Sequence, residues 1–183
     1  NSRIRDVDVA EETADLAIQA SLTGHLVFST LHTNNASGAL PRLLDMHAEP
    51  YLIASTVTCV VGQRVVRKIC PTCITPREAK IDISEKILQT LGNLTVNAGK
   101  PLKLFVGKGC KECTNTGYLG RVGIFEVLVV SEKIGRMILA HETSQAIEDQ
   151  SIREGTITMK QDGFLKVLEG VTTIEEVLRV AEE

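Results

Sequence analysis

The chain has 183 residues, of which 43% are hydrophobic and 23% are charged, with a formal net charge of −3 at pH 7. These values are ordinary for a globular protein with one domain of good size or two small ones. The negative charge and the absence of tryptophan argue against a nucleic-acid-binding protein, which relies on basic and aromatic side chains. No apolar run approaches the ~20 residues of a membrane-spanning helix. The chain starts without methionine or a signal-peptide pattern, so we expect a fragment.

The first predicted elements alternate between helix and strand. Apolar residues at helical spacing predict a helix over residues 12–21. The apolar, partly β-branched run at residues 25–31 predicts a strand buried on both faces, as in a parallel sheet. Helices are predicted next over residues 35–46 and 50–62, with Cys59 as a small buried residue in the second of them.

The following part of the chain is predicted to contain short strands and loops. An alternating, β-branched run predicts a strand over residues 63–69, and further strands are predicted over residues 102–106 and 121–130. Residues 81–91 predict a helix that ends at Gly92. The C-terminal part is predicted to be helical, with helices over residues 132–141, 144–155 and 158–170 and a last helix that begins at a capping box of Thr173 and Glu176.

Four of the five cysteines form two C-x-x-C pairs, Cys70 with Cys73 and Cys110 with Cys113, and 36 residues separate the pairs. Each C-x-x-C turn directs two thiolates at one point, so two pairs complete a tetrahedral zinc site without an open position. The alternatives are free thiols or a redox pair, but a redox C-x-x-C normally occurs singly at the start of a helix. The pattern therefore favours a structural Zn²⁺ site and a reducing compartment.

Two histidines lie at the ends of the predicted strand over residues 25–31. His32 follows its carboxyl end, where ligands bind in open α/β sheets, and precedes a predicted helix whose free N–H groups favour an anion. His25 lies at the other end, roughly 23 Å away, so one phosphate in one subunit cannot touch both. On the pattern alone, His32 is equally well explained as an ordinary residue at the end of a strand.

Several segments together resemble the type II secretion and type IV pilus assembly ATPases. The segments are Glu12-Thr13-Ala14, TGHLVFSTLHTN at residues 23–34, RLLDM at residues 42–46 and QRVVRKIC at residues 63–70. The second of them is similar to the histidine box of that family. The resemblance implies the C-terminal part of a hexameric ring ATPase with a RecA-like core. Such a motor works at the cytoplasmic face of the inner membrane, with a membrane platform or adaptor protein as its partner.

The resemblance also implies roles for individual residues. His32 and His25 would be the catalytic histidines that sense the γ-phosphate of ATP. Arg64, Arg67 and Arg5 would contact the nucleotide or a neighbouring subunit, because a guanidinium matches phosphate and carboxylate oxygens. The alternative for the arginines is a solvated strand edge. ATP and Mg²⁺ are the implied cofactors of the full-length parent, and many family members carry a tetracysteine metal module at this place.

Two features separate this chain from an active member of that family. The phosphate-binding pattern G-x-x-x-x-G-K-[ST] does not occur in it, so we do not expect the chain alone to hydrolyse ATP. The family reads G-E-I-R-D-x-E-T-A, whereas Arg3 stands at the glutamate position and five residues separate Asp6 from Glu12. A cloning junction, an insertion of about one helical turn and a degenerate motor remain as explanations.

We therefore predict an α/β chain with three segments. Residues 1–69 are the remnant of a RecA-like, parallel-sheet ATPase core with the histidine box. Residues 70–120 are an inserted tetracysteine zinc module, and residues 121–183 are a strand and a helical C-terminal subdomain. The predicted function is that of a fragment of a motor for type IV pilus assembly or type II secretion. The alternative is a non-catalytic, zinc-stabilised docking module for a membrane platform protein.

Overall fold

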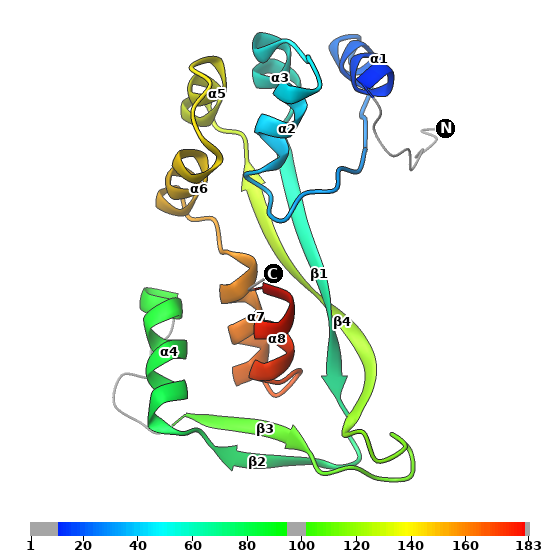
Figure 1. Cartoon of the computed structure of the whole chain (residues 1–183), viewed down its shortest axis with the longest axis vertical. Coiled ribbons are helices and arrows are strands. Elements are labelled where there is room, and N and C mark those ends of the chain that lie inside the picture. The colour runs from blue at the N-terminus through cyan, green and yellow to red at the C-terminus, as the bar shows by residue number, and fades with distance from the viewer. Residues whose placement is uncertain (1–10, 95–101, 182–183) are drawn as a thin grey trace. The chain divides into compact units, whose positions relative to one another are not determined.

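A computed structural model describes residues 11–94 and 102–181 and shows a mixed α/β chain (Figure 1). The described helices are α1 (Glu11–Leu22), α2 (Ala39–Asp45), α3 (Pro50–Thr56), α4 (Ile81–Leu91), the short 3-10 helix η1 (Gly92–Leu94), α5 (Glu132–Leu139), α6 (Ser144–Arg153), α7 (Met159–Leu168) and α8 (Ile174–Ala181). The described strands are β1 (Cys59–Ile69), β2 (Ile74–Glu78), β3 (Lys103–Gly107) and β4 (Tyr118–Val129). None of the helices in the described ranges is long and apolar enough to cross a membrane.

The chain divides into two compact units, each made of two separated segments. Unit 1 comprises residues 1–62 and 126–156, and unit 2 comprises residues 63–125 and 157–183. The division crosses β1 and β4, which pair with each other in a two-stranded sheet. The prediction of three functional segments, by contrast, stays a prediction.

Unit 1 is built mainly from helices that share one apolar core. This core contains residues from α1, α2, α3, α5 and α6 together with the end of β4: Ile18, Leu40, Ile53, Leu128, Ile134, Ile138 and Ile147. Ser131 caps α5 by accepting the backbone N–H of Ile134, and Thr143 caps α6 in the same way. The sequence predicted Ser131 as the cap of the first of these helices and either Thr143 or Ser144 as the cap of the second, and the structure shows Ser131 and Thr143 in these places.

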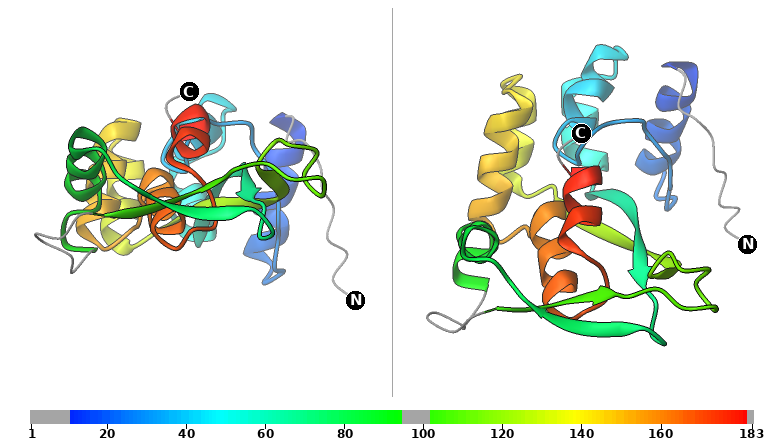
Figure 2. Two further views of the ribbon diagram at one scale, coloured as in Figure 1. Left: turned by 90° about the horizontal axis from the view of Figure 1, so that it is seen from below. Right: turned by 60° about the horizontal axis from the view of Figure 1, so that its bottom comes forward.

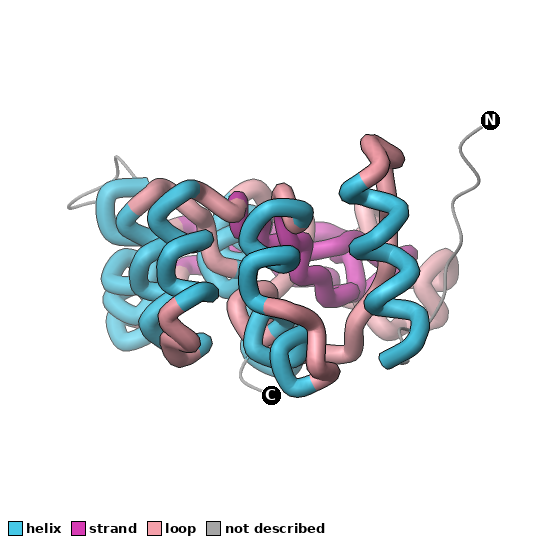
Figure 3. Tube along the Cα trace, turned by 90° about the horizontal axis from the view of Figure 1, so that it is seen from above, coloured by secondary structure: helices cyan, strands magenta, loops and turns pink. Residues whose placement is uncertain are grey.

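Unit 2 contains an antiparallel ladder of β2 and β3 that is covered by helices. Figure 2 shows α7 beside α8 on one side of this ladder, and Figure 3 colours the helices, strands and loops of the described chain. The apolar core joins α4, β3, α7 and α8: Ile87, Leu91, Leu102, Leu104, Phe164, Val167, Ile174 and Val177. Gly163 allows α7 and α8 to approach, since a Cβ there would lie 2.5 Å from a methyl of Val177. The helix predicted over residues 81–91 is confirmed as α4.

The prediction of a strand over residues 25–31 is wrong. Only an isolated bridge occurs there, at Thr30, and the side chains of Leu26 and Phe28 are 74% and 59% exposed. A strand buried on both faces needs neighbours on both sides. The two sheets of the described residues consist of other strands, so the apolar run belongs to neither of them.

The helix predicted over residues 50–62 is too long, and the interpretation of Cys59 is wrong. The helix α3 ends at Thr56, and Cys59 is the exposed first residue of β1. The β-branched residues that follow Thr56 favour an extended backbone, which outweighs their apolar character as a helix signal. The helix predicted over residues 35–46 begins only at Ala39, because Asn35 accepts the backbone N–H of Gly38 and forms a turn instead.

The predicted capping box at the start of α8 is replaced by a buried ion pair. The carboxylate of Glu176, whose side chain is 2% exposed, accepts the backbone N–H of Arg67 at 2.9 Å and its Nη2 at 2.7 Å. Arg179 adds a bond at 3.0 Å. The Arg67 guanidinium also lies 4.2 Å from the ring centre of Tyr118. Glu176 thus joins α8 to β1 within unit 2.

The same contacts make the stability of the chain depend on pH. The hydrogen bond from Arg67, helped by Arg179 and opposed by burial, lowers the pKa of Glu176 to about 2. A folded-state pKa below the unfolded value of ~4.3 means that the stabilisation is present above that value and is lost as pH falls towards 2. Glu176→Gln removes the ion pair, and we expect it to lower the free energy of unfolding at pH 7. Solvent screens the half-exposed Arg67, which limits the expected loss to about 2 kcal/mol.

This prediction is checked by urea denaturation of both proteins between pH 7 and pH 2. The difference between Glu176→Gln and the unchanged chain should shrink as pH falls below ~4.3. Glu175→Gln is the matched control, since Glu175 is the exposed neighbour in the same first turn of α8 and should change stability little. A difference that stays constant down to pH 2 would contradict the ion-pair explanation.

Candidate functional site

The four cysteines of the two C-x-x-C pairs converge in unit 2. The sulfur atoms of Cys70, Cys73, Cys110 and Cys113 all lie within 4.8 Å of one another. The separations are 3.8 Å for Cys70–Cys110, 3.9 Å for Cys73–Cys113 and 3.6 Å for Cys110–Cys113. A tetrahedral zinc ion with Zn–S distances of ~2.3 Å requires sulfurs about 3.8 Å apart. The cluster therefore has the dimensions of a four-cysteine metal site.

The ladder of β2 and β3 brings the two pairs together. Cys73 directly precedes β2, and β3 ends at Gly107 just before Cys110. The two strands pair antiparallel with Ile74 opposite Gly107, so the first pair and the second pair meet at the same end of the ladder. The 36 residues between the pairs are thus closed by backbone hydrogen bonds, which removes most of the entropic difficulty of joining distant ligands.

The turn at the second pair depends on a close approach of two glycines. A Cβ at Gly107 would lie 2.0 Å from the carbonyl oxygen of Gly117. Gly117 has φ of +78°, a conformation that favours glycine, and its carbonyl accepts the backbone N–H of Cys70 at 2.9 Å. The same glycine donates its own N–H to the sulfur of Cys113 at 3.3 Å. Gly117 therefore contacts both halves of the cluster.

The sulfurs of the cluster differ in how readily they ionise. Burial opposes ionisation of Cys113, but the backbone N–H groups of Cys110 and Gly117 outweigh it and lower its pKa to about 6. Burial and the neighbouring thiols of Cys113, Cys70 and Cys110 raise the pKa of Cys73 to about 12. Four adjacent thiolates repel one another, so full ionisation needs a cation between them.

The surroundings of the cluster suit a structural rather than an open site. Cys70 and Cys113 are buried, while Cys73 and Cys110 are partly exposed. The hydroxyl of Thr72 donates to the carboxylate of Glu112, which joins the two turns through side chains outside the cluster. All four sulfurs come from the chain itself, and a fourfold sulfur set leaves no position for a substrate.

The two histidines lie in unit 1, and both are exposed. The Nδ1 atom of His25 lies 2.9 Å from the hydroxyl oxygen of Thr23. His32 lies three residues before a turn at residues 35–38, in which Ala36 and Ser37 are 3% and 2% exposed. The roles predicted for these histidines stay predictions.

The predicted arginines have different surroundings. Arg67 is held by Glu176 and Tyr118, and Arg64 is a partly buried residue of β1. Arg5 lies outside the described residues. Contact of these arginines with a nucleotide or a second subunit stays a prediction. For Arg67, such a contact would have to compete with the buried carboxylate of Glu176.

Two carboxylates that the sequence interpretation did not select hold the turn after His32. Glu126 of β4 accepts the backbone N–H of Ala36, and Glu148 of α6 accepts from the side chain of Asn35. The signal was present for Glu126, because this glutamate stands within the apolar strand sequence IFEVLV at residues 124–129. A charged residue in such a run needs a specific partner.

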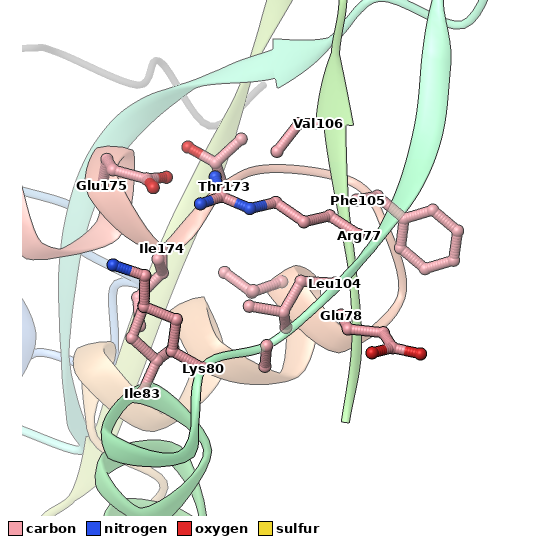
Figure 4. Close-up of a pocket in the computed structure, with 12 residues that line it drawn as sticks. Arg77, Glu78, Lys80, Ile83, Leu104, Phe105, Val106, Thr173, Ile174 and Glu175 are labelled. Carbon is pink, nitrogen blue, oxygen red and sulfur yellow. The ribbon is translucent and has the colours of Figure 1, made fainter. Parts of the chain in front are cut away.

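A separate pocket in unit 2 is lined by residues of β2, β3 and the start of α8. Figure 4 shows Arg77 and Lys80 reaching towards Thr173 and Glu175 at the first turn of α8, above the apolar side chain of Leu104. None of the cysteines or histidines discussed above lines this pocket. It therefore adds nothing to the metal cluster or to the histidine segment.

Comparison with known proteins gives relatives over nearly the whole chain. A family model described as "Type II/IV secretion system protein" matches residues 3–179. The chain is 46% identical over 172 residues to type II secretion system protein E of Pseudomonas aeruginosa, covering 94% of this chain and 33% of that protein. It is 44% identical over 180 residues to type II secretion system ATPase E of Vibrio cholerae, covering 98% and 33%.

A pilus protein is similar as well. The type IV pilus assembly ATPase PilB of Thermus thermophilus is 41% identical over 167 residues, which cover 91% of this chain and 18% of that protein. The chain thus spans about a third or less of the length of these relatives.

Solved structures share the fold at low sequence identity. The ATPase DotB of Legionella pneumophila has a TM-score of 0.56 and 19% identity, covering 99% of this chain and 37% of that chain. The pilus retraction motor PilT with bound ADP has a TM-score of 0.57 and 20% identity, covering 99% and 38%. Because the family model matches residues 3–179 and the identities to the curated relatives exceed 40%, the chain belongs to the type II/IV secretion system protein family.

Proposed function

We propose that the chain is the C-terminal segment of an ATP-hydrolysing motor for type II secretion or type IV pilus assembly. The observation that carries this proposal is the 44% identity over 98% of the chain to a type II secretion system ATPase. The chain lacks the phosphate-binding pattern, so we infer that it does not hydrolyse ATP alone and that the rest of the motor supplies this loop.

The apolar segment before His32 fits a part of a RecA-like core. Leu26, Val27 and Phe28 are exposed large apolar side chains in consecutive positions. Apolar side chains that point to both sides of an extended backbone are typical of a central strand in a parallel sheet. We infer that this segment becomes such a strand when the whole core is present, which places His32 at its carboxyl end.

The histidine segment supplies the candidate catalytic residues of the motor. His32, and with it His25, would act in the histidine box, His32 by donating to the γ-phosphate of ATP or by relaying its state to a neighbour. Arg64, Arg67 and Arg5 would contribute contacts to the nucleotide or to the next subunit. ATP and Mg²⁺ would bind in the parent, in which this chain contributes only part of the site.

We propose that the four cysteines hold one structural Zn²⁺ ion. Three of the sulfur separations are 3.6–3.9 Å and all four sulfurs lie within 4.8 Å of one another, which supports a tetrahedral site, and the donor set of four thiolates is typical of structural zinc. The ion would supply the positive charge that allows all four sulfurs to ionise. Its effect would be to hold the end of β1, the ladder of β2 and β3, and the start of β4 together.

The assembly proposed for the parent is a homohexamer at the cytoplasmic face of the inner membrane, with a membrane platform or adaptor protein as partner and no nucleic acid. The family membership and the names of the relatives support a role in secretion or pilus assembly, and the hexamer, its location and its partner are what the sequence resemblance implies. The alternative is a non-catalytic, zinc-stabilised docking module. The closed sulfur site favours this alternative as far as residues 70–120 are concerned, because such a site stabilises a surface and performs no chemistry.

Removal of the metal tests the zinc proposal. We expect a strong chelator to lower the free energy of unfolding by more than about 3 kcal/mol, because metal binding is coupled to folding. Cys110→Ser should have a similar effect. Cys59→Ser is the matched control, since Cys59 is exposed and outside the cluster. Thermal unfolding followed by circular dichroism measures the change, and equal melting temperatures with and without chelator would contradict the proposal.

Substitution of His32 tests the motor proposal. In the parent protein, we expect His32→Ala to lower kcat for ATP hydrolysis about 100-fold while the Kd for ATP changes less than about twofold. The physical reason is that a donor to the γ-phosphate acts mainly in the transition state. Steady-state turnover and nucleotide titration measure the two quantities. Equal losses of binding and turnover would indicate a structural histidine instead.

A further inference from the structure

The turn that follows His32 is held by several polar contacts. It comprises residues 35–38, and Asn35 accepts the backbone N–H of Gly38 at 3.0 Å. The hydroxyl of Thr33 donates to the carbonyl of Asn35 at 2.9 Å. The turn leads directly into α2, whose first residues are buried in the core of unit 1. Only Thr33 and Asn34 lie between His32 and this turn, and Thr33 is itself bonded to it.

Glu126 of β4 supports this turn from within unit 1. Its Oε1 atom accepts the backbone N–H of Ala36 at 2.5 Å, and the residue is only 9% exposed. The position opposite is Gly62 of β1, where a Cβ would lie 2.8 Å from the Cγ of Glu126. A side chain at position 62 would thus push the carboxylate away from the turn. The sequence provides both the acceptor and the space for it.

Glu148 of α6 supports the same turn from a second element. Its Oε2 atom accepts from the Nδ2 of Asn35 at 3.2 Å and lies 3.5 Å from the hydroxyl of Ser37. Burial and the nearby charges of Glu126 and Asp149 raise the pKa of Glu148. Two like charges are therefore close to each other beside one short turn.

We propose that Glu126 and Glu148 are positioning residues that fix the turn at residues 35–38 and, through it, the place of His32. This inference rests on the proposed function, because the position of His32 matters only if His32 acts on the nucleotide. Neither carboxylate would touch the substrate. Their effect passes through the Ala36 N–H and the Asn35 side chain.

Packing alone does not explain this arrangement. Burial of a carboxylate is unfavourable unless every bond is made, and two adjacent carboxylates repel each other. An apolar residue at position 126 would continue the strand sequence IFEVLV without either penalty. The carboxylate of Glu126 instead receives a backbone N–H from a turn of another segment. That contact is specific for the geometry of the turn, which is the property a positioning residue needs.

The test uses two substitutions of Glu126 in the parent protein. Glu126→Gln keeps the chain length and an oxygen that accepts the Ala36 N–H, whereas Glu126→Asp keeps the charge but is one methylene too short to reach it. We expect Glu126→Asp to lower kcat for ATP hydrolysis about tenfold with little change in KM, and Glu126→Gln to retain nearly full activity. Glu142→Gln, at an exposed residue that follows α5, is the matched control.

Hydrogen exchange in the 183-residue chain gives a readout that does not need ATP. We expect faster exchange of the Ala36 amide in Glu126→Asp than in Glu126→Gln at equal melting temperature. If Glu126→Asp fails to fold, Asn35→Ala replaces it, since this change removes the bonds of the partly buried Asn35 side chain to Glu148 and to the Gly38 N–H. Full activity of Glu126→Asp with a loosened turn would overturn the inference.

The failure of the inference is distinguishable from the failure of the proposed function. If His32→Ala leaves turnover unchanged, the proposed role of His32 is wrong, and the inference falls with it. If His32→Ala is inactive but Glu126→Asp and Asn35→Ala are fully active, only the positioning role is overturned. If Glu126 acts through His32, adding Glu126→Asp to His32→Ala should cause no further loss of ATP turnover.

Discussion

The structure of unit 2 depends on the requirement that four sulfur atoms meet at one point. Cys70 and Cys73 come directly after β1, and Cys110 and Cys113 come just after β3, so distant parts of the sequence must end at the same place. The antiparallel ladder of β2 and β3 brings the two cysteine pairs to the same place. Gly107 and Gly117 make this possible because neither has a side chain, so their backbones can approach closely. The buried ion pair of Glu176 then ties α8 to β1 three residues before the first of these cysteines.

Local signals in the sequence predicted much of this arrangement. The starts of the helices α5, α6 and α7 follow from the side-chain oxygens of Ser131, Thr143 and Thr158, which accept backbone N–H groups a few residues ahead. The cysteine cluster was also predictable, because two C-x-x-C turns restrict their sulfurs whatever the intervening loop does. Such features depend on interactions between residues that are close in the sequence, which is why they can be read from it.

Features that depend on distant partners could not be predicted in the same way. The apolar run at residues 25–31 has the composition of a buried strand, but whether it forms one depends on neighbouring strands. Glu176 was predicted to close a capping box, yet Arg67, more than a hundred residues earlier, binds it instead. Glu126 was not selected from the sequence, although it is a charge within an apolar strand, and nothing nearby in the sequence identifies the Ala36 N–H as its partner.

The central claim is that the cysteine cluster is a closed structural metal site in a segment of a secretion or pilus motor. The most direct test is the metal content of the purified chain together with X-ray absorption at the zinc edge. The account predicts one zinc ion per chain with four sulfur ligands at ~2.3 Å and no oxygen or nitrogen ligand. A chain that is folded and free of metal, or that joins these cysteines as disulfides, would contradict it.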